Sequence, residues 1–229
     1  MPVCDDKKIV RILHVVGGMD TGGIETWLMH MLRRIDKDRY RFDFLTHTTK
    51  PCFYDEEIKS LGCRIIPCPY PTRPWQYAPN FLRILKESGP YDAVHSHVHH
   101  FSGFTVMLAK QAGVPIRIAH SHNDTSSTEG RAGMLRQFYY QSTKWLIRRY
   151  CTVGLACSNL AAINLFGKDW ERDSRCRILY FGLDFDSFTK PVDRAQVRGE
   201  WGIPMDAFVM GHVGRFMEQK NHDFLLDVF

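Results

Sequence analysis

The sequence predicts an α/β protein with a Rossmann-like, doubly wound parallel sheet that is covered by helices on both faces. Short apolar segments alternate with segments of helical periodicity along residues 10–181. Such alternation is typical of parallel strands that are joined by right-handed helical crossovers. Glycines or histidines also follow several of the predicted strands directly, at the position where ligands bind in open α/β sheets.

The first strand is predicted at residues 10–16, an apolar segment that runs into Gly17 and Gly18. An apolar stripe at three- and four-residue steps predicts the helix that follows, and Glu25 favours its N-terminus through its charge. Residues 40–45 alternate and predict the second strand.

The remaining elements of the first domain continue this alternation. Helices are expected at residues 55–61, 77–87, 101–112 and 133–149, and strands at 64–66, 93–95, 116–119, 153–156 and 178–181. Ser158 is expected to cap one more helix, because a serine hydroxyl can accept from a free N–H of the first turn. The first domain therefore spans residues 1–185, and an aperiodic connector follows the last strand.

Residues 186–229 are expected to begin a second, truncated Rossmann-like domain. A helical segment at 192–201, an apolar strand at 208–213 and a helix from residue 221 repeat the earlier pattern. One strand and one helix cannot cover both faces of a sheet, so this domain is expected to be incomplete.

Bulk composition narrows the functional classes. The seven cysteines form no CxxC pair, which speaks against a disulfide framework or a zinc knuckle. No apolar segment approaches the roughly 20 residues that span a bilayer, so a cytoplasmic location is expected. The net charge of +5 suits a phosphate-bearing ligand or an anionic membrane, whereas no recognised motif indicates nucleic-acid binding.

A glycine-rich loop separates the first strand from the first helix. Gly17, Gly18, Gly22 and Gly23 would let backbone N–H groups approach an anion such as a diphosphate beside a helix N-terminus. The loop matches neither the dinucleotide fingerprint nor a P-loop. Glycine turns of this kind also serve packing alone, and both interpretations stay open.

Histidines are concentrated after two predicted strands. The cluster comprises His95, His97, His99, His100, His120 and His122. Strand alternation would place His95, His97 and His99 on one face, which makes a metal site one interpretation of the cluster. Because residues 94–103 contain no acidic residue or cysteine, contact with a polar substrate or acid–base work by one histidine is favoured over a metal, with satisfied core histidines as the alternative.

Two further segments carry basic residues. Arg215 and Lys220 lie in a loop before a predicted helix and suit a diphosphate, although such residues are often only solvated. Residues 131–150 mix basic and aromatic residues, as in helices that lie on an anionic membrane. The favoured interpretation is a core helix with a solvated basic face, because aromatic-rich stripes mostly pack inward.

Five segments in order resemble the retaining GT-B glycosyltransferases of family 4, or group 1, especially bacterial members from capsule and exopolysaccharide clusters. They are HVVGGMDTGGIE (14–25), DAVHSHVHHFSG (92–103), IRIAHSHND (116–124), ACSNLAAINLFG (156–167) and GHVGRFMEQKNHDFLLDVF (211–229). The chain ends before the glutamate-containing ExxxxxxxE segment of that family, and FGLD at 181–184 replaces its usual Asn-Gly-Ile/Val-Asp.

The resemblance implies an N-terminal acceptor domain and a C-terminal domain that binds a nucleotide diphosphate sugar, expected to be a UDP-sugar, without a metal. It makes His97 the catalytic candidate, with the glycine loop approaching the substrates and Arg215 and Lys220 neutralising the donor diphosphate. The other candidates for substrate contact are His95, His120, His122 and Asn123.

The leading hypothesis is transfer of a hexosyl unit, with retention, to a glycan or lipid-linked glycan acceptor, with peripheral contact to the inner face of the membrane. This half of the sequence shows no carboxylate pair of the kind that retaining glycosidases use. A GT-B nucleotide-sugar epimerase and a non-catalytic module that binds glycan or membrane are the alternatives.

Overall fold

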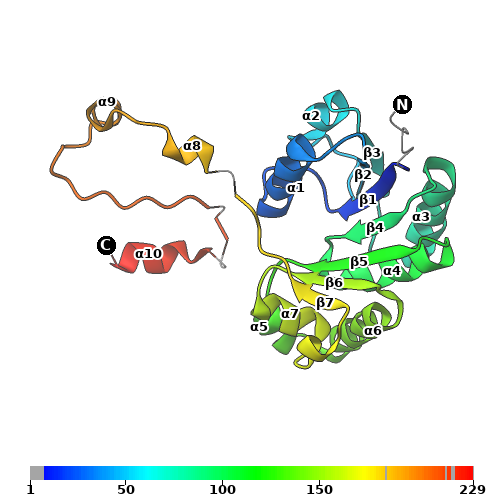
Figure 1. The fold of residues 1–229 in the computed structure, drawn as a ribbon. Helices are drawn as coiled ribbons and strands as arrows, with labels where there is room; N and C mark the ends of the chain where they lie inside the picture. Colours follow the sequence, from blue (N-terminus) through cyan, green and yellow to red (C-terminus); the bar gives the residue numbers. More distant parts are fainter. Residues whose placement is uncertain (1–7, 184, 215, 218–219, 229) are drawn as a thin grey trace, which may run out of the picture. The chain divides into compact units, whose positions relative to one another are not determined.

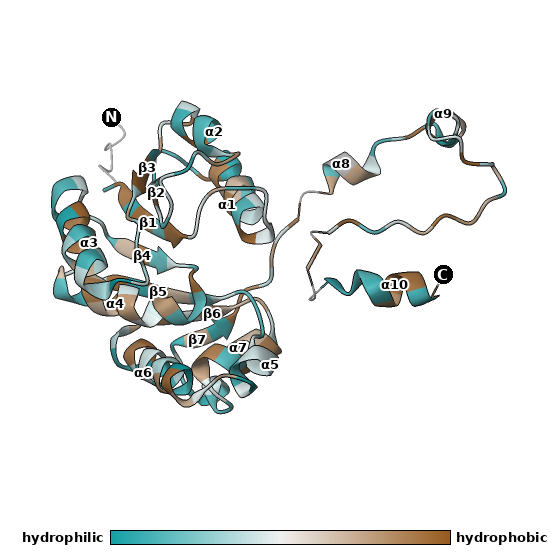
Figure 2. Cartoon of the chain, turned by 180° about the vertical axis from the view of Figure 1, so that it is seen from behind, coloured by the Kyte–Doolittle hydropathy of each residue, from teal (hydrophilic) through white to brown (hydrophobic). Residues whose placement is uncertain are grey.

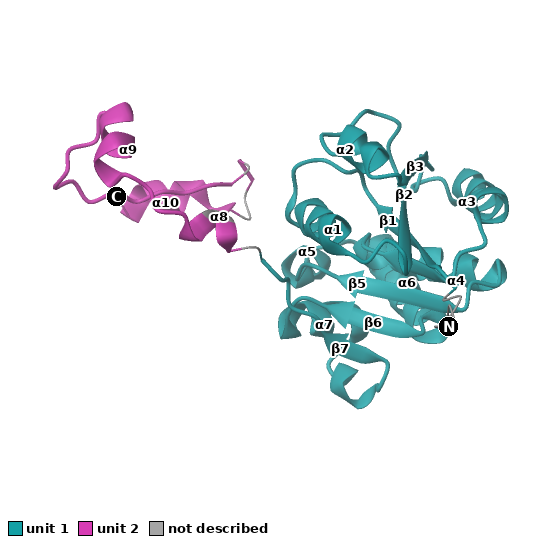
Figure 3. Ribbon diagram, turned by 45° about the horizontal axis from the view of Figure 1, so that its top comes forward, with its two compact units in different colours: residues 1–184 teal, residues 185–229 magenta. Residues whose placement is uncertain are grey.

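The computed structural model describes residues 8–183, 185–214, 216–217 and 220–228 (Figure 1). The chain divides into two compact units, Met1–Asp184 and Phe185–Phe229 (Figure 3). Each unit is described by itself.

The first unit contains a seven-stranded, entirely parallel sheet, as predicted, with the order β3-β2-β1-β4-β5-β6-β7. The strands are β1 (Val10–Val16), β2 (Tyr40–Thr46), β3 (Arg64–Pro67), β4 (Ala93–Ser96), β5 (Ile116–Ser121), β6 (Val153–Ala156) and β7 (Cys176–Ile178). The order reverses between β1 and β4, and ligands of doubly wound sheets bind at this reversal.

Every predicted helix of the first unit is present. The helices are α1 (Gly23–Arg34), α2 (Asp55–Ser60), α3 (Pro74–Ser88), α4 (Ser102–Gln111), α5 (Ser126–Gly130), α6 (Met134–Tyr150) and α7 (Asn159–Phe166), with short 3-10 turns η1 (His99–Phe101) and η2 (Trp170–Arg172). The helix cap at Ser158 is confirmed, since its Oγ accepts from the backbone N–H of Ala161 at 3.2 Å. The sequence analysis did not predict α5, η1 or η2.

Strand alternation in β1 sorts the core onto the two faces of the sheet. Leu13 and Val15 join a cluster with residues of α3 and α4, whereas Val16 joins a second cluster with residues of α1 and α2. Figure 2 shows hydrophobic residues along β1 and β2. His14 lies between Leu13 and Val15 and therefore points to the face that α1 covers.

The buried side of α6 is narrower than the sequence predicts. Tyr140, Thr143 and Ile147 are buried, but Phe138 is 75% exposed and Trp145 is 59% exposed. The prediction that the aromatic residues of 131–150 pack inward is therefore wrong for Phe138 and Trp145. A helix that packs along one side buries only that side, and these two residues lie on the other.

The second unit contains helices α8 (Asp186–Thr189), α9 (Arg194–Glu200) and α10 (His222–Val228), so the two helices predicted from residues 192 and 221 are confirmed. The predicted strand at 208–213 is wrong, because these residues form no strand and Phe208 is 85% exposed. An apolar segment becomes a strand only where a neighbour accepts its backbone hydrogen bonds, and none of the described residues 185–228 forms a strand. In the first unit, the strand expected at 178–181 instead occupies 176–178, where β6 pairs with it.

Candidate functional site

The sheet brings the glycine loop and the histidines together at one edge. The loop follows β1, His97 follows β4 and His122 follows β5, and all three strands are parallel. The carboxyl ends of these neighbouring strands therefore meet at the point where the strand order reverses. The topology thus brings the glycine loop, His97 and His122 to one edge of the sheet.

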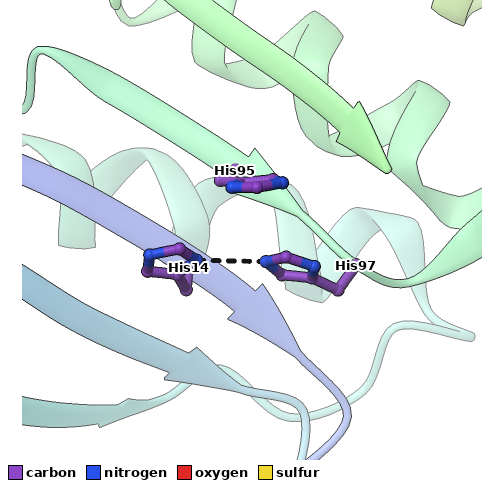
Figure 4. Close-up of side chains that lie close together, drawn as sticks. All are labelled: His14, His95 and His97. Carbon is purple, nitrogen blue, oxygen red and sulfur yellow. Dashed lines mark hydrogen bonds between the residues drawn. The ribbon is translucent and has the colours of Figure 1, made fainter. Parts of the chain in front are cut away.

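Three imidazole rings form a hydrogen-bonded chain within this edge, which we call the imidazole chain: His14, His97 and His122. Nδ1 of His14 lies 3.0 Å from Nε2 of His97 (Figure 4), and Nδ1 of His97 lies 2.9 Å from Nε2 of His122. His97 thus uses both ring nitrogens on other histidines. A neighbouring pair links Nε2 of His95 to Nδ1 of His120 at 3.1 Å.

Burial keeps these rings neutral. It lowers the pKa of His14 to about 3, with a further contribution from His120, and lowers the pKa of His122 to about 2 with help from His120 and His99. Burial also holds the pKa of His97 well below its ordinary value, and all of the neighbours that lower it further are histidines. The site therefore offers neutral hydrogen-bonding groups rather than cations at neutral pH.

A chain of neutral imidazoles must be oriented in one direction. Each neutral ring has one N–H donor and one acceptor nitrogen, so donation runs either from His14 to His122 or the opposite way. Nε2 of His14 and Nδ1 of His122, at the two ends, are buried and have no partner among the described residues. A ligand that bonds to one end would therefore select the tautomer of all three rings.

Aromatic side chains cover the histidines. The rings of Trp27 and Phe181 stack with centroids 5.0 Å apart, and Trp27 meets His120 edge-on at 5.5 Å. Phe181 also lies 5.5 Å from His122. Sequence reasoning missed the site role of His14, Trp27 and Phe181. Phe181, which stands where the resembled family usually has Asn, therefore lines the site.

The glycines of the loop have different surroundings. A Cβ at Gly18 would lie 3.0 Å from both Cys52 Sγ and Thr48 Cγ2, so this glycine serves close packing. A Cβ at Gly17 or Gly23 would meet nothing within 4 Å. Gly22 is the N-cap of α1 and would meet only the side chain of Glu25. The glycine loop thus retains open space at two of its four glycines, Gly17 after β1 and Gly23 at the start of α1.

The prediction that His95, His97 and His99 share one face is wrong for His99. The strand ends at Ser96, and His99 begins η1 with a φ of 48°, which turns it to a second cluster. There Nε2 of His99 hydrogen-bonds to Thr125 Oγ1 at 2.8 Å. Nε2 of His100 lies 2.8 Å from Oε1 of Glu129. The other oxygen of this carboxylate, Oε2, accepts from Lys144.

Three sets of side chains have ligand atoms close enough to hold a metal ion. They are His14, His95 and His97; His97, His120 and His122; and His99, His100 and Glu129. Binding in either of the first two sets would require His97 to give up one of its two hydrogen bonds. In the third set Lys144 already neutralises Glu129 at 2.8 Å. Two of the three sets therefore share His97, and the third shares Glu129 with Lys144.

The other predicted site residues lie outside this cluster or outside the described residues. Asn123 is exposed, and its carbonyl oxygen accepts from Ser121 Oγ at 3.4 Å. Lys220 is exposed in the second unit. Arg215 and Asp184 lie outside the described residues.

A parallel, doubly wound domain with polar groups at its reversal point, followed by a second unit, is the architecture of one half of a GT-B glycosyltransferase. Residues 22–163 match the family described as "Glycosyl transferase 4-like domain". This match covers more than half of the chain, which therefore belongs to that family.

Relatives and solved structures agree with this assignment. The chain is 39% identical over 220 residues to a Bacillus subtilis (strain 168) protein named for glycosyltransferase activity, EpsF, covering 94% of this chain and 56% of that protein. It is 26% identical to the capsular polysaccharide biosynthesis glycosyltransferase CapH of Staphylococcus aureus, covering 96% and 57%. Anabaena Alr3699/HepE, solved with UDP and glucose, shares the fold with a TM-score of 0.71 at 19% identity, covering 95% and 57%. The chain thus spans slightly more than half the length of these relatives.

Proposed function

We propose that the whole protein transfers a hexosyl unit from a nucleotide diphosphate sugar to a glycan or lipid-linked glycan acceptor, with retention, in the synthesis of a surface polysaccharide. The family and the name of EpsF support a glycosyltransferase. The name of CapH points to polysaccharide synthesis. A UDP-sugar is the proposed donor, since HepE was solved with UDP and glucose.

The imidazole chain is the observation that carries this proposal. His97 lies beyond β4 at the reversal point, and it is neutral, buried and aligned by two ring hydrogen bonds. A neutral imidazole can donate to or accept from a sugar hydroxyl, so His97 is the proposed contact to the transferred hexose. His97 is only 5% exposed, so this contact requires His122 to release it.

Retention is proposed to proceed without an enzyme nucleophile. Both ring nitrogens of His97 hydrogen-bond to histidines rather than to a carboxylate. The donor phosphate would then assist the acceptor hydroxyl on the face from which it departs. Arg215 and Lys220 are proposed to stabilise the departing diphosphate, because charge-assisted hydrogen bonds to phosphate oxygens are strong. No metal is proposed for this step.

The reaction is proposed to take place in the cytoplasm, at the inner face of the membrane. None of the helices in the described part of the chain is long and apolar enough to cross a bilayer.

The test is sugar transfer by the whole protein with UDP-sugars and membrane-extracted acceptor. His97→Ala should lower kcat/KM by about 100-fold or more, because general acid–base or hydrogen-bonding groups contribute that much. His30→Ala in α1 is the matched control and should retain the wild-type rate. An unchanged rate in His97→Ala would refute the role of His97. Conversion of a UDP-sugar without acceptor would instead indicate an epimerase.

A further inference from the structure

The outer face of α6 carries an exposed apolar stripe. Met134 is 90% exposed, Phe138 75% and Trp145 59%, and their spacing of four and seven residues places them on one side of the helix. Leu135, at 91% exposure, borders them. Figure 2 shows both hydrophobic and hydrophilic residues along α6. An apolar stripe of this size in water requires an explanation beyond helix packing.

The segment that carries this stripe has charges of one sign. Residues 131–150 contain five basic residues and no aspartate or glutamate. Lys144 is neutralised by Glu129, while Arg131 and Arg149 are exposed at the two ends of the segment. An amphipathic helix that combines exposed aromatic residues with arginines suits the interface of an anionic bilayer, where both kinds of side chain are stabilised.

A groove adjoins the stripe on the same helix. It has a volume of about 840 Å³ and is lined largely by apolar side chains from four segments, including Pro71, Phe104, Tyr139 and Leu146. Val98, another lining residue, directly follows His97 in the chain. The groove therefore extends from α6 to Val98, in the loop that follows β4.

We propose that the outer face of α6, comprising Met134, Leu135, Phe138, Trp145 and Arg149, docks on an anionic lipid bilayer together with Arg131, which precedes the helix. This surface would bring a lipid-linked acceptor to the adjoining groove, a consequence that rests on the proposed function. Charge favours lipid over a second copy of the chain. Two copies of a segment with five basic residues and no acidic ones would repel each other, whereas anionic headgroups attract it.

Vesicle sedimentation tests this surface with the 229-residue chain and no nucleotide sugar. The chain should sediment with vesicles that contain phosphatidylcholine and phosphatidylglycerol, and not with phosphatidylcholine alone. The double variant Phe138→Ser/Trp145→Ser should lower the vesicle partition coefficient by about tenfold or more, because it removes the two aromatic side chains that would enter the bilayer. Arg131→Ala and Arg149→Ala should each lower it by about fivefold.

Matched controls lie on other parts of the same unit. Phe53→Ser removes an aromatic side chain of similar exposure, 69%, and Lys168→Ala removes an exposed charge. Both should bind vesicles like the wild type, and far-ultraviolet circular dichroism should show every variant folded. All the substituted residues are exposed, so loss of binding in the α6 variants alone would report on the surface itself.

Three results would overturn the proposal. The wild type could stay in the supernatant with both vesicles, or Phe138→Ser/Trp145→Ser could sediment like the wild type. The same variant could also convert a dimer into a monomer while vesicle binding is unchanged, which would identify an interface between copies. Vesicle binding combined with an absence of sugar transfer by the whole protein would refute only the proposed function.

Discussion

Acidification should unfold the first unit in a pH range where carboxylates remain ionised. Burial lowers the pKa of five histidines to about 4 or below, namely His14, His47, His99, His120 and His122. Their ordinary value is 6.5. Below that pH the unfolded chain binds protons at these rings while the folded chain does not, so the free energy of unfolding falls as the pH falls toward about 4.

The size of this effect follows from the shift in each ring. At pH 5.5, one unit below the ordinary value, each neutral buried histidine lowers the free energy of unfolding by about 1.4 kcal/mol. Five such rings give a loss on the order of 7 kcal/mol, which is comparable with the ~5–15 kcal/mol that stabilises a typical domain. Glu129 does not contribute in this range. Burial raises its pKa, but hydrogen bonds from Lys144 and other partners outweigh this and lower the pKa to about 2.

Urea denaturation at pH 8.5, 7.5, 6.5 and 5.5 measures this dependence. The midpoint should hardly change between pH 8.5 and 7.5, because histidines are neutral in both states, and should fall steeply below pH 6.5. His47→Gln, which lies outside the imidazole chain, should reduce the slope by the share of one ring. An equal midpoint at pH 7.5 and 5.5 would show that the buried histidines are protonated in the folded protein, and would refute their neutral state.

Two further substitutions test the packing of the fold. Gly103→Ala in α4 should destabilise the unit by about 1–3 kcal/mol in urea denaturation, because the new Cβ would collide with the Thr143 carbonyl of α6. Gly130→Ala is the control, since this glycine has open space around it. Equal losses of stability in the two variants would contradict the close approach of α4 and α6. Asp43→Asn should cost about 1 kcal/mol, since the 10% exposed carboxylate accepts from Arg64 at 2.6 Å but solvent screens Arg64, which is 47% exposed. An unchanged midpoint in Asp43→Asn would show that this ion pair does not stabilise the sheet.

Much of the first unit follows from local pattern. Alternating apolar segments and helical stripes predict the parallel sheet, and the capping role of Ser158 follows from its hydroxyl alone. The position of His97 and His122 at one edge also follows, because parallel strands bring their carboxyl ends together. These inferences need only local periodicity and the handedness of crossovers.

The remainder depends on which strands are neighbours. The bond between His14 and His97 exists because β1 lies beside β4, in a register that pairs His14 with His95. The alternation of strands and helices along the chain does not reveal the order of the strands in the sheet. Phe181 reaches the histidines only after the chain has passed through β7, far from them in sequence.

Exposure was the other property that local pattern predicted poorly. The aromatic residues of 131–150 resemble a core stripe, yet Phe138 and Trp145 point outward, because only one side of α6 packs against α4. The segment at 208–213 is as apolar as a strand but has no partner among the described residues. In both cases the outcome depends on neighbours in space rather than on the segment itself.

The anomeric configuration of the product tests the central claim most directly. The whole protein should be incubated with a UDP-α-hexose and membrane-extracted acceptor, and the product examined by NMR spectroscopy. The proposed function predicts a new α-glycosidic bond on the acceptor and release of UDP, both slowed by about 100-fold or more in His97→Ala. A β-linked product, or an altered UDP-sugar formed without any acceptor, would contradict it.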